Sequence, residues 1–80
     1  LALMNDPFVS QQADGWAGRL LGGYPDDAAR IQAAWLEAYG RPPAPTEVDF
    51  CSSFLADPEN GGWQGLCHAL YNVKEFVHVP

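Results

Sequence analysis

The sequence predicts a small all-α domain: a bundle of about four helices in two helical hairpins, with a short C-terminal turn and tail. Three observations predict this fold. Apolar side chains recur at helical spacing in four segments of the chain. Clusters of Gly, Pro, Asn and Asp separate these segments, and such clusters form turns. A chain of 80 residues makes one small domain, and its short connections favour antiparallel neighbouring helices.

The first predicted helix follows Asn5 and Asp6, either of which can cap it. Pro7 fits the first turn because the N–H that it lacks would have no partner there. The segment Gly22–Pro25 (Gly-Gly-Tyr-Pro) ends the helix. Its predicted apolar face contains Val9, Ala13, Trp16, Ala17, Leu20 and Leu21.

The second predicted helix begins after Asp26, which is a good N-cap, and ends at Gly40. Arg41 lies near the negative end of this helix, and Pro42 and Pro43 prevent its continuation. Its predicted apolar face contains Ala28, Ile31, Ala34, Trp35, Ala38 and Tyr39.

The third predicted helix begins near Pro45 and runs to about Ala56. Two starts fit the sequence: Ala44 precedes Pro45 in the first turn, or Thr46 caps the helix. Residues 57–62 (Asp-Pro-Glu-Asn-Gly-Gly) have the composition of a turn. The predicted apolar face contains Val48, Cys51, Phe54 and Leu55, with Phe50 at its edge.

The fourth predicted helix runs from about Trp63 to Tyr71. Asn72 and Glu75 have the spacing of a capping box, which predicts a helix break and then one last short turn that carries Phe76 to the core. The predicted apolar face contains Trp63, Leu66, Cys67, Leu70 and Tyr71.

The charge of the chain limits its partners. Ten Asp and Glu oppose four Lys and Arg, which gives a net charge of −6. This balance argues against nucleic acid, which requires a basic surface, and against an anionic membrane surface. No apolar run is long enough for membrane insertion. The chain begins with the apolar run Leu-Ala-Leu-Met, so we expect residues 1–80 to be one helical domain from the C-terminal part of a longer multidomain protein.

The neighbours Cys67 and His68 suggest a haem or metal site at first sight. Covalent haem attachment needs C-x-x-C-H, but Gln64 occupies the place of the first cysteine. On a helix, adjacent side chains point about 100° apart, so Cys67 and His68 cannot easily share one ion. His78 lies in the predicted tail. We therefore predict no cofactor and no metal.

Cys51 and Cys67 each lie eight positions from the middle of the turn at residues 57–62. In an antiparallel hairpin, residues equidistant from the turn meet at the same level, so the two cysteines are plausible neighbours. They are either buried free thiols or a disulfide, and a disulfide needs Cα atoms within about 7 Å.

No catalytic constellation is found. Ser52 and Ser53 lie inside a predicted helix without the turn that exposes a nucleophile, and Cys67 has no placed base. We predict no catalytic residue, and an enzyme is the less favoured interpretation of this chain.

Three groups of residues carry a resemblance to a known family. They are Asn5, Pro7, Phe8 and Val9; Gly40, Arg41, Pro42 and Pro43 with Glu47; and Leu70, Asn72, Glu75 and Phe76. With these motifs the chain resembles the C-terminal part of the planctomycete PSD domain, the "domain of unknown function" family fifteen-fifty-three. Tyr71 and Val73-Lys74 depart from the family pattern.

The resemblance implies an exported protein, periplasmic or at the cell surface, whose other domains often include a cytochrome c module. It supplies no catalytic residues, and its export context makes a disulfide between Cys51 and Cys67 about as plausible as two free thiols. We expect a non-catalytic packing or interaction module that contacts the rest of the parent chain or a protein partner. In the alternative, Arg41, His68 or Glu75 completes an active site with residues upstream, or Trp63 and Tyr71 bind a glycan.

Overall fold

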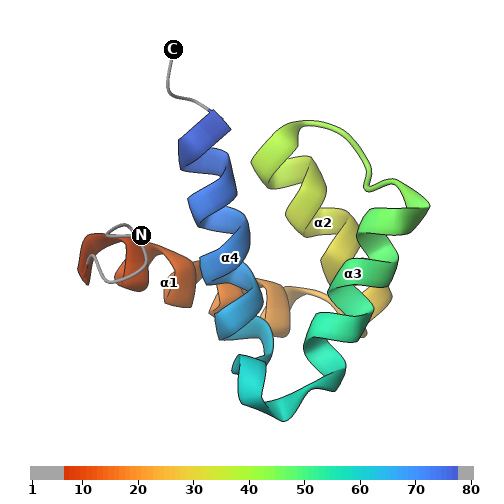
Figure 1. Ribbon diagram of the computed structural model, residues 1–80, viewed down its shortest axis with the longest axis horizontal. Coiled ribbons are helices and arrows are strands. Elements are labelled where there is room, and N and C mark those ends of the chain that lie inside the picture. The colour runs from red at the N-terminus through yellow and green to blue at the C-terminus, as the bar shows by residue number, and fades with distance from the viewer. Residues whose placement is uncertain (1–6, 78–80) are drawn as a thin grey trace.

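The computed structural model describes the backbone of residues 7–77 and the side chains of residues 7–73. Its elements are α1 (Pro7–Gly23), α2 (Asp27–Tyr39), α3 (Pro45–Ala56), the 3₁₀ turn η2 (Pro58–Asn60) and α4 (Gly62–Val77), as Figure 1 shows. Residues 7–77 contain no strand. The predicted all-α bundle of four helices is confirmed. The cap predicted at Asn5 or Asp6 lies outside the described residues.

Both ends of α2 are fixed by the residues expected from the sequence. The carboxylate of Asp26 accepts a 2.9 Å hydrogen bond from the backbone N–H of Ala29. At the other end Gly40 adopts the left-handed conformation with φ 72°, and its N–H donates to the carbonyl of Leu36 over 3.1 Å. A side chain with a Cβ atom would strain this backbone, so glycine is favoured here.

The sequence allowed two positions for the start of α3, and the structure contains the first of them. Ala44 is the N-cap and Pro45 is the first helical residue. Because the methyl group of Ala44 cannot accept a hydrogen bond, the capping contact comes from Glu47, whose carboxylate accepts a 2.7 Å bond from the N–H of Ala44.

The connection from α3 to α4 depends on a close backbone approach at Gly65. A Cβ atom at this position would overlap the carbonyl oxygen of Asn60, and the ring of Phe54 lies just beyond. The side chain of Asn60 donates a 3.0 Å bond to the carbonyl of Phe54. Glycine at position 65 therefore lets η2 fold back against the first turns of α4.

The predicted helix break at Asn72 is wrong, because α4 continues without interruption from Gly62 to Val77. The side chain of Asn72 donates a 3.0 Å bond to the carbonyl of His68, four residues earlier. Asn72 thus satisfies its amide inside the helix instead of capping a new one. Glu75 and Phe76 lie in the last turns of the same helix, and the predicted contact of Phe76 with the core falls outside the described side chains.

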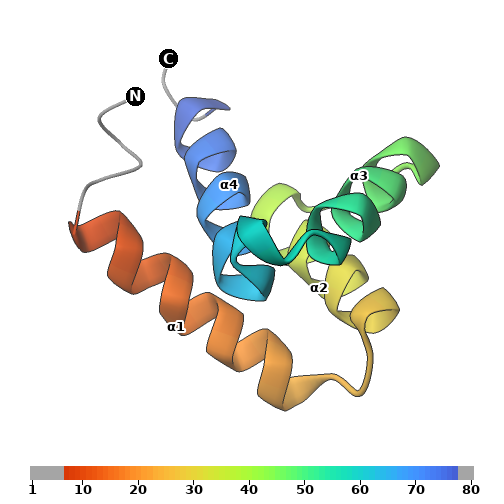
Figure 2. The same ribbon diagram turned by 60° about the horizontal axis from the view of Figure 1, so that its bottom comes forward.

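Helix α4 is the centre of the bundle and contacts α1, α2 and α3. Figure 2 shows α1 on one side of α4 and the pair α2 and α3 on the other. The most extensive contact joins α1 to α4, the first and last helices of the described residues. The two predicted hairpins are α1 with α2 and α3 with α4. They do not pack as separate units, because α1 of the first hairpin packs mainly on α4 of the second.

The core draws on all four helices. Leu20, Leu66, Cys51 and Cys67 are its largest fully buried side chains. Leu21 was predicted to lie on the apolar face of α1 but is 45% exposed, because the buried stripe of this helix is narrower than the pattern suggested. The buried core residues are Val9, Ala13, Trp16, Ala17, Leu20, Ile31, Ala33, Ala34, Trp35, Cys51, Trp63, Leu66, Cys67 and Leu70.

Within residues 7–77, no helix combines the length and the hydropathy that a membrane crossing requires.

Candidate functional site

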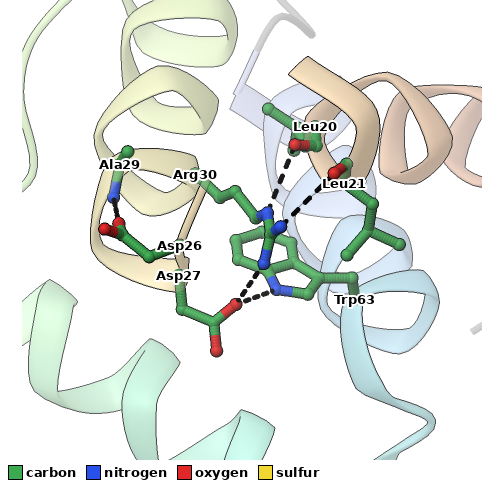
Figure 3. Close-up of polar contacts among 7 residues, drawn as sticks. All are labelled: Leu20, Leu21, Asp26, Asp27, Ala29, Arg30 and Trp63. Atoms are coloured by element: carbon green, nitrogen blue, oxygen red, sulfur yellow. Dashed lines mark hydrogen bonds and ion pairs between the residues drawn. The ribbon is translucent and has the colours of Figure 1, made fainter. Parts of the chain in front are cut away.

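A polar cluster joins three helices where α1 ends and α2 and α4 begin (Figure 3). Arg30 is at its centre and donates to the backbone carbonyls of Leu20 and Leu21, both over 3.3 Å. These carbonyls belong to the last turns of α1, where the helix supplies no internal partners. Arg30 therefore caps α1 from the neighbouring helix and places a positive charge at the negative end of its dipole.

Asp27 connects this cluster to α4. Its Oδ1 atom lies 3.0 Å from Arg30 Nη1 and accepts a 2.8 Å hydrogen bond from the indole N–H of Trp63. The bond from Trp63 is the main reason why the pKa of Asp27 lies below its usual value, and Arg30 lowers it further. Every polar contact in the cluster stabilises the helix junction, so the cluster is structural.

Arg41 forms a second structural contact, with Glu47. The two guanidinium nitrogens Nη1 and Nη2 donate to the two carboxylate oxygens over 2.9 and 2.8 Å. This bidentate contact, together with the N–H of Ala44, lowers the pKa of Glu47 to about 2. The Gly-Arg-Pro-Pro motif and its following glutamate thus close the connection between α2 and α3, with Pro42 and Pro43 between the paired charges.

Cys51 and Cys67 are both fully buried free thiols in the structure, so the reduced form of the two alternatives is the one that it contains. Burial raises the pKa of Cys51 to about 11 and that of Cys67 to about 12. A thiol reacts as its thiolate, so both groups are poor nucleophiles at neutral pH.

His68 does not share a site with Cys67. Cys67 points into the core, whereas His68 Nε2 lies 3.2 Å from Asp14 Oδ1 on α1. The predicted divergence of the two side chains is confirmed. No group of three or more His, Cys, Asp or Glu side chains suited to a metal ion occurs among the described residues. His78 lies outside them.

The two aromatic residues considered for a glycan site have different surroundings. Trp63 is 7% exposed, and its N–H is used by Asp27, so it offers no open platform to a sugar. Tyr71 lines a surface groove of about 240 Å³ between α1, α2 and α4. The other lining residues are Gln12, Trp16, Arg19, Glu37 and Ala38.

This groove was not predicted from the sequence. Its residues come from three helices, and Trp16 was assigned to the core, where most of its surface does lie. One signal was present in the sequence. Arg19 and Glu37 are charged residues next to the apolar stripes of their helices, and such positions border the contact between helices.

The fold and these contacts define a small all-α helical domain whose described polar clusters stabilise its helix junctions. The chain has no match among protein-family models, curated proteins or solved structures.

Proposed function

We propose that this domain is a non-catalytic packing and interaction module of a larger exported protein. The observation that carries the proposal is the exposure of six large apolar side chains among the described residues 7–73. Burying one such side chain at an interface is worth roughly 1.5–3 kcal/mol. The six are Phe8 (61% exposed), Leu21 (45%), Tyr24 (38%), Leu36 (54%), Phe50 (53%) and Val73 (51%).

The structural contacts of the polar residues support the same proposal. Arg30, Arg41 and Glu47 are engaged in contacts that close turns or cap helices. The thiols of Cys51 and Cys67 are buried and protonated at neutral pH. A catalytic site requires a reactive group in reach of substrate, and these groups do not supply one.

The larger and exported parent protein is inferred from the resemblance to the planctomycete PSD domain. Within the described side chains that resemblance rests on Pro7, Phe8 and Val9, on the Gly40–Pro43 motif with Glu47, and on Leu70 and Asn72. The contact between Arg41 and Glu47 gives the second of these motifs a structural reason. In the proposal, the cytochrome c module found in such proteins belongs to another part of the parent chain.

Sedimentation velocity over a range of protein concentrations tests the exposed surface. We expect the 80-residue chain to self-associate or to bind an apolar dye, and Phe50→Gln or Leu36→Gln to reduce both effects. Ser53→Gln is the matched control, because it changes an exposed polar residue on the same helix as Phe50. A chain that stays monomeric at every concentration and binds no dye would contradict the proposal.

The alternative is that Arg41, His68 or Glu75 completes an active site with residues upstream. No observation favours it: Arg41 is paired with Glu47, and His68 is paired with Asp14.

A further inference from the structure

The groove between α1, α2 and α4 contains a cation with no partner among the described side chains of residues 7–73. Among the three arginines of the chain, Arg30 and Arg41 each form an ion pair and further hydrogen bonds. Arg19, within the described part of the chain, forms neither. Arg19 lines the groove, and its guanidinium carries five N–H donors.

An anion lies in the same groove and is held in place. Glu37 on α2 accepts a 2.9 Å hydrogen bond through Oε1 from the indole N–H of Trp16 on α1. This bond fixes the carboxylate and leaves its second oxygen without a hydrogen bond to the described side chains of residues 7–73. Trp16 is itself 6% exposed and therefore a rigid support.

The two opposite charges line one groove without pairing with each other, since no ion pair joins Arg19 and Glu37. Both act on the same buried group: Glu37 raises the pKa of Cys67, whereas Arg19 lowers it. Charge effects weaken with distance, so both charges lie close to the same part of the core. The groove is thus lined by a positive and a negative side chain that are not paired with each other.

We propose that this groove binds a small zwitterion, whose carboxylate contacts Arg19 and whose ammonium group contacts Glu37. The planar guanidinium matches a carboxylate in a bidentate geometry. One molecule that carries both charges has an advantage over two separate ions, because its second contact is intramolecular. The volume of about 240 Å³ lies below the range of drug-sized sites, which suits a molecule of amino-acid size.

The uncharged lining completes the site. Gln12 adds an amide that can donate or accept beside the two charges, and Tyr71 adds an aromatic surface. This inference is independent of the exposed apolar residues, so a failure of one proposal leaves the other standing.

Titration of the ¹⁵N-labelled chain, followed by amide chemical shifts, tests the inference. The probes are L-alanine and 5-aminopentanoate, which place their charges at different spacings, with acetate and methylammonium as single-charge controls. We expect at least one zwitterion to give saturable shifts at residues of the groove, and to bind at least about tenfold more tightly than either control. Acetate binding as tightly as both zwitterions would overturn the proposal, as would the absence of saturation with either zwitterion.

Two variants locate the binding. Arg19→Gln and Glu37→Gln each remove one charge, and the new amide oxygen at position 37 can still accept from Trp16. We expect each to weaken the binding roughly tenfold, as the loss of a charge-assisted contact does. Asp49→Asn is the matched control, because it removes an exposed carboxylate on α3 that does not line the groove. Unchanged affinity in both groove variants would overturn the proposal.

Discussion

The indole N–H of Trp63 donates a 2.8 Å hydrogen bond to the carboxylate of Asp27, a residue 36 positions earlier in the chain. Trp63 stands in the first turn of α4 and Asp27 in the first turn of α2. The same carboxylate oxygen pairs with Arg30, which in turn caps α1. A single aromatic donor thus ties the start of the central helix to the junction of the first two.

Loss of the donor at position 63 should destabilise the domain. Trp63→Phe removes the N–H and part of the buried ring, and we expect it to lower the free energy of unfolding by about 2–4 kcal/mol. Asp27→Asn is the matched variant, since its amide oxygen can still accept from Trp63 and the Asp27 side chain, which pairs with Arg30, is 57% exposed. We expect it to cost less than about 1 kcal/mol. Urea denaturation measures the free energy of unfolding of both variants. If Trp63→Phe costs as little as Asp27→Asn, the hydrogen bond is not the main contribution of Trp63.

The close approach at Gly65 gives a prediction with opposite signs at two glycines. Gly65→Ala would drive a methyl group into the backbone of Asn60, and we expect a loss of about 1–3 kcal/mol or more. Gly18→Ala, on the exposed side of α1 with open space around it, should stabilise the domain by about 0.5–1 kcal/mol through helix propensity. Thermal or urea unfolding of both variants checks the signs, and a neutral Gly65→Ala would contradict the packing of η2 on α4.

The pairing of Glu47 predicts a dependence of stability on acid pH. Arg41 first, and then the N–H of Ala44, hold the pKa of Glu47 at about 2, against a usual value of 4.5. A carboxylate whose pKa is lower in the folded state contributes stability above pH 4.5 that is lost as the pH falls towards 2.

We therefore expect Glu47→Gln to be less stable than the parent chain at pH 6, and the difference to shrink as the pH falls from 4.5 to about 2. Arg41→Gln should show the same trend, because it removes the main cause of the shift. Urea denaturation at several pH values makes the measurement. A difference that stays constant over this range would mean that the contact between Arg41 and Glu47 does not contribute.

The two cysteines predict the opposite dependence at alkaline pH. Their pKa values in the folded chain, about 11 for Cys51 and about 12 for Cys67, exceed the usual 9.0. Stability from the buried neutral thiols is present below pH 9 and is lost as the pH rises through 11 to 12. We expect slow reaction with a thiol reagent in the native state and two reactive thiols in denaturant without reductant. No reactive thiol under the second condition would establish a disulfide instead.

The sequence was most informative where a helix boundary depends on one local residue. Pro45 and Asp57 enclose α3, and its predicted range from Pro45 to Ala56 agrees with the structure. Gly40 was expected to end α2 and does so in the left-handed conformation that favours glycine. The prediction of a helix break at Asn72 also depended on one local residue, and it is wrong. Asparagine is common at helix caps, but its side chain can equally donate to a carbonyl of the preceding turn.

The contacts between distant segments could not be read from local pattern. Asp27 lies in the first turn of α2, and nothing in the spacing of the sequence indicates that its carboxylate accepts a hydrogen bond from Trp63. The groove could not be predicted for the same reason. Arg19, Glu37 and Tyr71 come from three helices, and they line one groove only because of how α1 and α2 pack on α4. Periodicity predicts which face of a helix is buried, but not the partner that covers it.

The central place of α4 also bears on how the domain is made. A ribosome releases α1, α2 and α3 before the helix on which all three pack, since α4 begins only at Gly62. During synthesis the apolar stripe of α1 therefore lacks its most extensive native contact, the one with α4, although the helix itself ends at Gly23. The domain therefore cannot fold helix by helix as the chain leaves the ribosome. Its core should assemble late and in one cooperative step, once α4 has left the exit tunnel.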